Sequence, residues 1–303
     1  MATAPSRPNA TGSKAPAGEG DKSSNSKEMT FLEHLEELRW LLFRSACAIA
    51  VGMVLAFIYK QFFFDTILFA ARDPDFITYR ALCWLGMRSG IDGMCIKEIG
   101  FTIQSAQVSG QFMTHMTVAF TAGLILAFPY VLWEIWRFVA PGLKATEKGA
   151  VASIVGFATL LFAIGIAFGY VVLVPLSVQF FGGYSVSASV QNIFMLDSYI
   201  GIVTSVTLWT GVVFQLPLVV VFLTRIGIAG PGFLRNYRRH GYVIVFVLAA
   251  IVTPPDVVSQ VLVGLPLILL YEVSILLSAR TQRRMERKRA EEDAQRVTAG
   301  TVA

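Results

Sequence analysis

Six apolar blocks follow one another along this chain, and they constrain its fold more than any other feature. The blocks cover residues 41–59, 112–136, 150–178, 199–223, 242–252 and 257–277. A helix of about 20 apolar residues, rising about 1.5 Å per residue, crosses the roughly 30 Å hydrocarbon core of a bilayer. Charged residues make up only 15% of the chain, against about 25% in soluble domains. The sequence therefore predicts an all-α polytopic membrane protein.

The distribution of positive charge predicts the topology. Cytoplasmic loops carry an excess of Lys and Arg, and here both termini and two of the loops are basic. The basic loop residues are Arg137, Lys144 and Lys148 after the second block, and Arg225, Arg235, Arg238 and Arg239 after the fourth. Segment 179–198 contains no Lys or Arg. Six transmembrane helices, N-in and C-in, satisfy this pattern.

The fifth block is short for a membrane span. About a dozen apolar residues, at 242–252, cover roughly 18 Å of a hydrocarbon core that is roughly 30 Å thick. We nevertheless expect this block to cross, because otherwise the Arg-rich tail would lie on the uncharged side of the membrane. Local thinning of the bilayer or flanking side chains would make up the difference in length.

The chain divides into an arm, a membrane domain and a tail. Residues 1–28 are rich in Ala, Pro, Gly, Ser and Lys and hold no apolar run, which predicts a disordered cytoplasmic arm and not a signal peptide. Residues 29–280 form the predicted membrane domain, and 281–303 a charged, helical cytoplasmic tail. The large outside loop, about 60–110, mixes acidic with basic residues, and we expect short helices there near the membrane surface.

Four of the blocks contain a proline, at Pro129, Pro175, Pro217 and Pro266. Each proline removes one backbone hydrogen bond and clashes with the preceding turn, so we expect kinks. Such kinks would bend the bundle into a concave wall that receives a partner. The alternative is that these prolines have no special role, because membrane helices tolerate proline better than soluble helices do.

Enzyme and metal motifs are absent from the sequence. There is no GxSxG, HExxH, P-loop or glycine-rich nucleotide motif. His34, His115 and His240 fall in separate segments, and no two of the three cysteines form a CxxC pair. We therefore expect no enzymatic activity, no metal and no cofactor. The net charge of +5 lies mostly beside apolar blocks, as membrane topology requires, so it does not indicate a nucleic-acid partner.

The stretch before the first block predicts a helix that begins on the cytoplasmic side. Thr30 and Glu33 have the spacing of a capping box. Phe31, Leu35 and Leu38 share one face, suited to the membrane interface, while Glu33 and Glu37 share another face that points to water. These acidic residues also suit the helix dipole, so the stretch alone leaves a purely structural role open.

Three further stretches carry motifs, and the first of them returns the chain to the same cytoplasmic surface. Residues 128–143 read FPYVLWEIWRFVAPGL, 214–217 read FQLP, and 253–260 read TPPDVVSQ. Together with residues 30–39, in this order and at six-span spacing, they resemble the TatC family, the multispanning subunit of the twin-arginine protein translocase. The resemblance runs from about residue 29 to 280, apart from some of the outside loop.

The resemblance implies a receptor and scaffold that exports folded proteins bearing Arg-Arg signal peptides, in an oligomeric complex with TatA- and TatB-type single-span subunits. It implies location in the bacterial cytoplasmic (inner) membrane. By motif match, the signal peptide would contact Glu37, Glu147, Phe138 and Arg39. The chemistry is consistent, because a carboxylate accepts two parallel hydrogen bonds from a guanidinium. The alternative for Glu147 is an exposed loop residue that merely neighbours Lys148.

Polar residues within or beside the blocks form a second group of candidates: Gln215, Thr253, Asp256, Gln260 and Glu272. Polar side chains are costly in hydrocarbon unless they face protein or water. The family resemblance places Thr253 and Gln260 where a partner's single helix docks, and Glu272 nearer the cytoplasm. Simple helix–helix hydrogen bonding is the alternative.

Two positions depart from the family pattern. Some family members carry Glu where this chain has Gln215, so an ionisable group is missing there. Glu134 stands where the family pattern leads us to expect an uncharged polar residue, and we expect it to pair with Arg137 at i,i+3.

The outside loop also carries Cys83 and Cys95, which we expect to form a disulfide in an oxidising compartment. Cys47 lies inside a span and should stay reduced.

One other class of function fits the same residues. Gln215, Asp256 and Glu272 would line the substrate path of an ion-coupled small-molecule secondary transporter. No internal symmetry of the kind seen in many secondary transporters is apparent in the sequence.

Overall fold

The structure of this protein is a computed structural model that describes residues 31–90, 95, 102–139, 151–187, 189, 192–252 and 257–301. The first part of the chain holds α1 (Phe31–Ile58), the π-helix η1 (Phe62–Leu68), the 3-10 helix η2 (Ala70–Arg72), α2 (Ile77–Ser89), β1 (Thr102–Gln104) and α3 (Gly110–Val139). The second part holds α4 (Val151–Phe168), the π-helix η6 (Gly169–Leu173), α5 (Val174–Gly183), β2 (Ile193–Met195), α6 (Leu196–Val213), α7 (Leu216–Arg225), α8 (Pro231–Asn236), α9 (Arg238–Val252) and α10 (Val257–Thr301).

Within the described residues, five helical stretches are long and apolar enough to cross a membrane. They are Leu35–Ile58, Gly110–Val139, Ile154–Gly183, Leu196–Arg225 and Val263–Gln295. These five correspond to the first four predicted blocks and the sixth, so the prediction of a mostly helical, multipass membrane protein is confirmed. The predicted fifth span corresponds to α9, whose 15 residues extend only about 22 Å. Its crossing stays a prediction.

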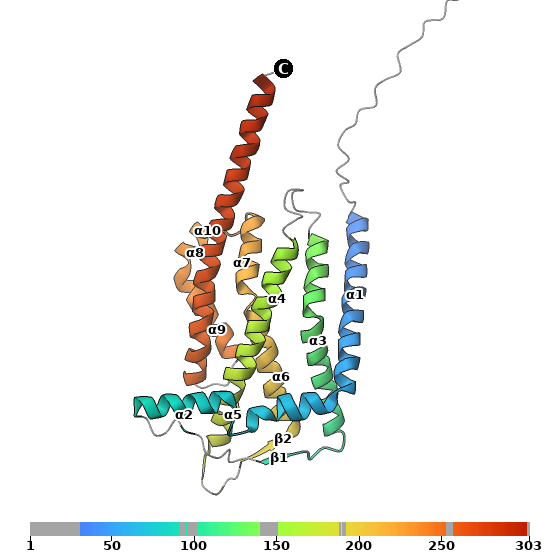
Figure 1. Cartoon of the computed structure of the whole chain (residues 1–303), viewed down its shortest axis with the longest axis vertical. Coiled ribbons are helices and arrows are strands. Elements are labelled where there is room, and N and C mark those ends of the chain that lie inside the picture. Colours follow the sequence, from blue (N-terminus) through green and yellow to red (C-terminus); the bar gives the residue numbers. More distant parts are fainter. Residues whose placement is uncertain are drawn as a thin grey trace, which may run out of the picture.

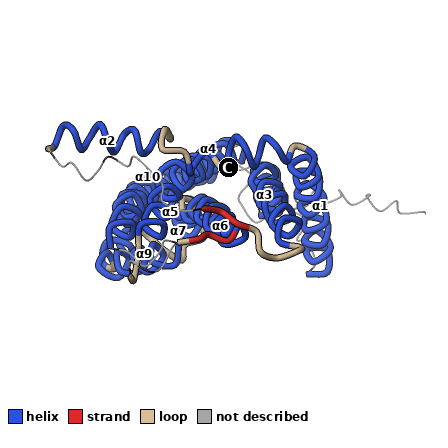
Figure 2. Tube along the Cα trace, turned by 90° about the horizontal axis from the view of Figure 1, so that it is seen from below, coloured by secondary structure: helices blue, strands red, loops and turns tan. Residues whose placement is uncertain are grey.

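The two ends of the bundle differ in structure. α1 begins and α10 ends at the same end, here called the termini end (Figure 1). At the opposite end, here called the cap end, η1, α2 and the two strands lie across the ends of the long helices (Figure 1). Seen along the bundle, α1 and α3 form one side of the molecule and α9 and α10 the other (Figure 2). The expectation of short helices in the outside loop is thus confirmed for its described residues.

Two short strands are an addition to the predicted all-α fold. β1 and β2 pair in parallel, with Thr102 opposite Ile193 and Gln104 opposite Met195. Each strand has only three residues. Such a short strand is too brief to show the alternating pattern by which strands are predicted, and its partner lies about ninety residues away in the sequence.

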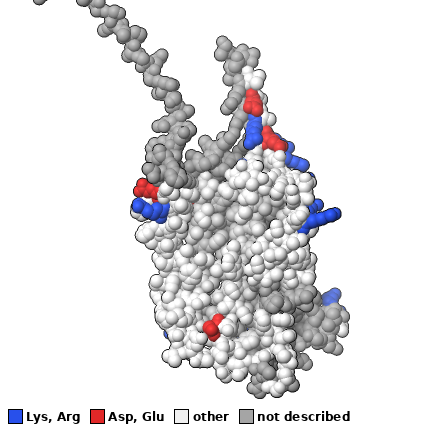
Figure 3. Space-filling model, turned by 180° about the vertical axis from the view of Figure 1, so that it is seen from behind, with Lys and Arg blue, Asp and Glu red and all other residues white. Residues whose placement is uncertain are grey.

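Charged side chains gather toward the termini end of the molecule. Figure 3 shows them there, at both edges of the face, while the middle of that face is almost free of charge. A wide uncharged belt is what the lipid tails of a bilayer require of a spanning protein.

The four prolines fall into two classes. Pro175 and Pro217 stand at the second position of α5 and α7, directly after the π-helix η6 and after a turn at Phe214 and Gln215. A proline has no N–H to offer the carbonyl four residues before it, so that carbonyl must find another partner. The other two, Pro129 and Pro266, lie inside the uninterrupted helices α3 and α10. The regular α-helix is thus interrupted just before Pro175 and Pro217, and it continues unbroken through Pro129 and Pro266.

Tyrosine hydroxyls satisfy backbone carbonyls at the cap end, where irregular turns leave carbonyls without helical partners. The Tyr199 hydroxyl donates to the Leu68 carbonyl at 2.7 Å, and the Tyr170 hydroxyl donates to the neighbouring Ile67 carbonyl. Tyr199 belongs to the main cluster of buried apolar residues, together with Leu173, Val174 and Ile200. The cap is therefore attached to the apolar core of the bundle.

Two glycines allow α1 and α3 to approach closely. A Cβ atom at Gly52 would lie 2.9 Å from the Gly123 carbonyl oxygen, and one at Gly123 would lie 2.5 Å from the Met53 nitrogen. Both distances are shorter than real Cβ contacts, so only glycine fits without movement of the backbone. Small residues play this role widely at helix–helix contacts in membranes.

Gly123→Ala is expected to lower the free energy of unfolding by about 1–3 kcal/mol, because the added methyl group must push α1 away from α3. The measurement is thermal or denaturant unfolding of the purified protein in detergent. Gly156→Ala on α4 is the matched control, since a Cβ at Gly156 meets nothing within 4 Å. The control should unfold at the same temperature or denaturant concentration as wild type, or at a slightly higher one, because alanine favours helix. Equal losses in both variants would contradict the close-contact argument.

Candidate functional site

The first turns of α1 carry exposed charged residues at the termini end. Glu36, Glu37 and Arg39 are all exposed. An Arg39 guanidinium nitrogen lies 3.5 Å from a Glu36 carboxylate oxygen, and the guanidinium lies 5.7 Å from the centre of the Trp40 ring. α1 begins at Phe31, where the sequence predicts a helix start. The predicted cap residue Thr30 lies outside the described residues.

Phe138 lies one residue before the end of α3, at the same end of the bundle, and is half-buried. The structure thus places Glu37, Arg39 and Phe138 on the termini ends of two adjacent helices. Glu147, the fourth predicted contact, lies outside the described residues. Its role in the site therefore stays a prediction.

Glu134 forms a polar cluster that joins α3 to α1 just below these residues. Only 5% of the residue is exposed. Its carboxylate lies 3.6 Å from an Arg44 guanidinium nitrogen on α1 and 3.8 Å from one of Arg137, and the Tyr130 hydroxyl donates to it at 3.1 Å. The pairing with Arg137 agrees with the i,i+3 expectation. The contact with Arg44 is not visible in the sequence, because it depends on how α1 and α3 are aligned.

Gln215 connects α6–α7 to α4. It is buried in the turn between α6 and α7, and its side-chain nitrogen donates to the Ala158 carbonyl at 3.2 Å. Gln215 thus faces protein, as expected for an amide within a membrane span. Its side-chain oxygen is buried without a hydrogen-bond partner among the described residues.

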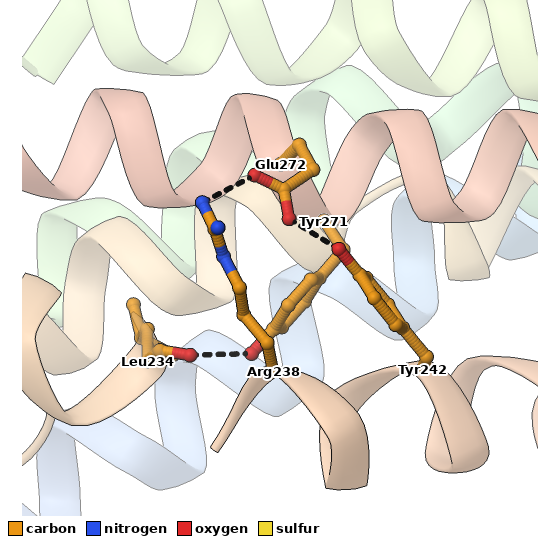
Figure 4. Close-up of polar contacts among 5 residues, drawn as sticks. All are labelled: Leu234, Arg238, Tyr242, Tyr271 and Glu272. Carbon is orange, nitrogen blue, oxygen red and sulfur yellow. Dashed lines mark hydrogen bonds and ion pairs between the residues drawn. The ribbon is translucent and has the colours of Figure 1, made fainter. Parts of the chain in front are cut away.

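Glu272 connects α10 to α9. An Arg238 guanidinium nitrogen lies 2.9 Å from its carboxylate, and the Tyr242 hydroxyl donates to it at 2.6 Å (Figure 4). Beside this pair the Tyr271 hydroxyl donates to the Leu234 carbonyl at 3.0 Å, so α8 is tied to the same place (Figure 4). Helix–helix hydrogen bonding, the alternative that the sequence leaves open, therefore describes Glu272 in this structure.

The remaining docking candidates are only partly described. Gln260 lies in the first turns of α10 and is half-buried. Thr253 and Asp256 lie outside the described residues. Among the residues that the structure describes, no group of three or more His, Cys, Asp or Glu side chains could hold a metal ion.

A disulfide joins Cys83 on α2 to Cys95 in the structure. Cys47 is free and exposed on α1. The bond closes a loop across a sequence separation of 12 residues. In the chain-entropy model, closing a loop of this size stabilises the fold by roughly 3 kcal/mol.

Comparison with known proteins identifies the family. A family model described as "Sec-independent protein translocase protein (TatC)" matches residues 33–266. The chain belongs to the TatC family. The match includes α1 from Glu33 onward and the first ten residues of α10, so it takes in Glu134 and Gln215 and ends before Glu272.

Relatives and solved structures agree over most of the chain. The TatC protein of Blattabacterium sp. subsp. Periplaneta americana is 36% identical over 83% of this chain and 95% of its own length. That of Halalkalibacterium halodurans is 34% identical over 87% of this chain and 94% of its own. A crystal structure described as the twin arginine translocase receptor TatC in DDM superimposes with a TM-score of 0.63 at 29% identity, covering 81% of this chain and 99% of that one.

TatC membership decides between the two functions that the sequence leaves open. The relatives are named translocase proteins, and the ion-coupled small-molecule transporter is not supported. The Gln215 amide, assigned there to a substrate path, bonds instead to the backbone of α4.

Glu134→Ala is expected to lower the free energy of unfolding by about 1–3 kcal/mol, because it removes the carboxylate that joins two helices and leaves two guanidinium groups unpaired. Glu36→Ala is the matched control: it breaks an ion pair whose side chains are both well exposed, which should cost less than about 1 kcal/mol. Unfolding in detergent measures both. A double-mutant cycle with Arg44→Ala should show coupling, and strictly additive losses would contradict a direct pair.

Maleimide added as membranes are dissolved in denaturing detergent is expected to label one cysteine of three, Cys47. Reduction before labelling should expose all three thiols, because Cys83 and Cys95 are then free. In Cys47→Ala the unreduced protein should take up no label. Labelling of Cys83 or Cys95 without reductant would show that the bond does not form in the cell.

Proposed function

We propose that this chain is the signal-peptide receptor and scaffold subunit of a twin-arginine translocase, which exports folded proteins across the bacterial cytoplasmic membrane. The observation that carries this proposal is the match to TatC over residues 33–266, together with the exposed acidic first turns of α1. The subunit acts by binding and positioning, without enzymatic activity or a cofactor.

Six spans with both termini in the cytoplasm are the topology that this function requires. The termini end carries the charged residues of α1, α9 and the α10 tail (Figure 3), and the positive-inside rule assigns such an end to the cytoplasm. α9 supplies the sixth span. A 15-residue helix can cross where the bilayer thins locally. With this topology, the cap end faces outward.

Signal-peptide recognition takes place at the termini end of α1 and α3. Glu37 presents an exposed carboxylate, with Arg39 and Phe138 nearby on the same two helices. The segment that contains Glu147 connects the ends of α3 and α4, which both lie at this end (Figure 1). Two carboxylates from two segments would bind the two consecutive arginines, each through a pair of parallel hydrogen bonds.

A hollow in the bundle supports the idea of a receiving wall. A largely apolar pocket of about 500 Å³ lies between α3, α4 and α6. Pro129 lines it, together with Thr159, Thr204 and Thr207. An apolar hollow with a few hydroxyl groups suits an apolar helix, which is the form of the single-span TatA- and TatB-type partners. Gln260, with Thr253 and Asp256, is the proposed docking place for such a helix where the chain passes from α9 to α10.

Glu37→Ala and Glu147→Ala are each expected to weaken binding of an Arg-Arg signal peptide about tenfold or more, because each leaves an arginine without its charged partner, worth roughly 1.5–3 kcal/mol. Affinity is measured for the purified protein in one detergent. A Lys-Lys peptide should bind wild type less well, since ammonium cannot form the paired hydrogen bonds.

Glu291→Ala is the control for that experiment, because it removes the same charge from an exposed site on α10, whose C-terminal part leaves the bundle at the termini end. It should bind like wild type. Unchanged affinity in both Glu37→Ala and Glu147→Ala would refute the recognition site and leave the membership of the family standing.

A further inference from the structure

Helix α2 projects sideways from the cap end of the bundle. It runs crosswise to the long helices and extends past α10, at about the level where α9 and α10 meet the cap (Figure 1, Figure 2). Its 13 residues make a rod about 20 Å long. Neither the signal-peptide site nor the docking candidates on α9–α10 include it.

The first turn of α2 is firmly attached to the bundle. Thr78 donates a hydrogen bond to the Val171 carbonyl, which lies four residues before Pro175 and so lacks the N–H that a non-proline residue would offer it. The buried Tyr79 hydroxyl donates to the Pro175 carbonyl at 3.1 Å, with the Ala71 carbonyl at 3.3 Å. Burial raises the pKa of Tyr79 well above its ordinary value, so the hydroxyl stays protonated and able to donate even in alkaline solution.

These attachments fix which face of α2 points away from the protein. Tyr79, Cys83 and Gly86 follow the i, i+4, i+7 spacing of one helix face. Tyr79 and Gly86 are buried, and Cys83 is joined to Cys95. That face is therefore directed at the bundle at Tyr79 and at Cys95 farther along the helix.

The opposite face is exposed and carries large apolar side chains beside two arginines, Arg80 and Arg88. Ile77 and Trp84, seven residues apart, are 64% and 56% exposed, and Met87 beside them is 70% exposed. The Arg88 guanidinium lies 5.6 Å from the centre of the Trp84 ring. A large aromatic ring, aliphatic side chains and arginines together are typical of helices that lie in the membrane interface, where the ring enters the acyl boundary and the arginine reaches phosphate.

We propose that α2 is an interfacial membrane anchor, whose face formed by Ile77, Trp84 and Met87 inserts into the lipid leaflet at the cap end. Lipid is the occupant because α2 lies along the plane of the bilayer, at the level of the helix ends, with its attached face fixed against the protein. The anchor sets the height of the cap relative to the membrane. The proposal rests on the membrane embedding of the bundle and not on signal-peptide recognition.

Quenching of Trp84 fluorescence tests the anchor. The full chain is placed in lipid nanodiscs at one copy per disc, so that no second copy can cover α2. The spectrum of Trp84→Phe, subtracted from that of wild type, isolates the Trp84 emission. Lipids that carry bromine near the headgroup should remove much of this emission, lipids brominated near the chain ends should remove less, and aqueous iodide should have little effect.

Trp209→Phe supplies the matched control. Trp209 is 54% exposed and lies about 20 Å along α6 from its cap-end start, so bromine near the chain ends should quench it most. Trp84 emission that iodide quenches and bromolipids leave unchanged would place α2 in water and overturn the proposal. Emission resistant to both would mean that protein covers Trp84, which also overturns it. The affinity of Trp84→Phe for the signal peptide is measured as well. If it equals that of wild type, the receptor function is intact, and either failure concerns the anchor alone.

Discussion

The contact between α1 and α3 determines where the proposed recognition residues lie. Gly52 and Gly123 bring the two backbones together within the membrane, and the carboxylate of Glu134 holds Arg44 nearer the termini end. These two contacts are about 16 Å apart along α3, from eleven residues at 1.5 Å each. Two helices joined at two separated points have a fixed distance and a fixed alignment. Glu37 and Phe138 are therefore carried by one rigid unit.

Polar residues within the membrane domain repeatedly connect one helix to another. Glu134 joins α3 to α1, Gln215 joins α6–α7 to α4, and Glu272 joins α10 to α9. In hydrocarbon an unpaired polar group is costly, so a polar side chain in a span is strongly driven to a neighbouring helix. Such residues can look like a substrate path when only their presence in apolar segments is known. Their partners show that they hold the bundle together.

The sequence was sufficient to predict five of the spans, because their apolar blocks reach the length that the bilayer demands, and this needs no knowledge of long-range contacts. It was also sufficient for contacts within one helix, such as Glu134 with Arg137. It could not predict the Arg44 contact, which depends on the alignment of two helices some ninety residues apart in the chain. The same reason hid the β1–β2 pairing and the Thr78 bond to Val171.

The apolar blocks locate the membrane spans and not the ends of the helices. α10 continues as one helix to Thr301, well beyond the apolar block that ends at 277, and the sequence predicts this charged tail as helical. Lys, Arg, Glu and Gln, which fill its tail, are good helix formers, so the helix has no reason to stop where the membrane does. Hydrophobicity locates the part of a helix that lies in lipid, whereas propensity and caps decide where the helix ends.

The two ends of the bundle are held by different kinds of interaction, and this difference suits a receptor. At the cap end, tyrosine and threonine hydroxyls bond to backbone carbonyls and a disulfide closes the loop, contacts that salt hardly affects. At the termini end, ion pairs such as Arg39 with Glu36 are exposed, and salt and competing charges readily weaken them. A charged ligand can therefore exchange partners with residues at the termini end at little cost, while the cap end keeps the helices in their arrangement.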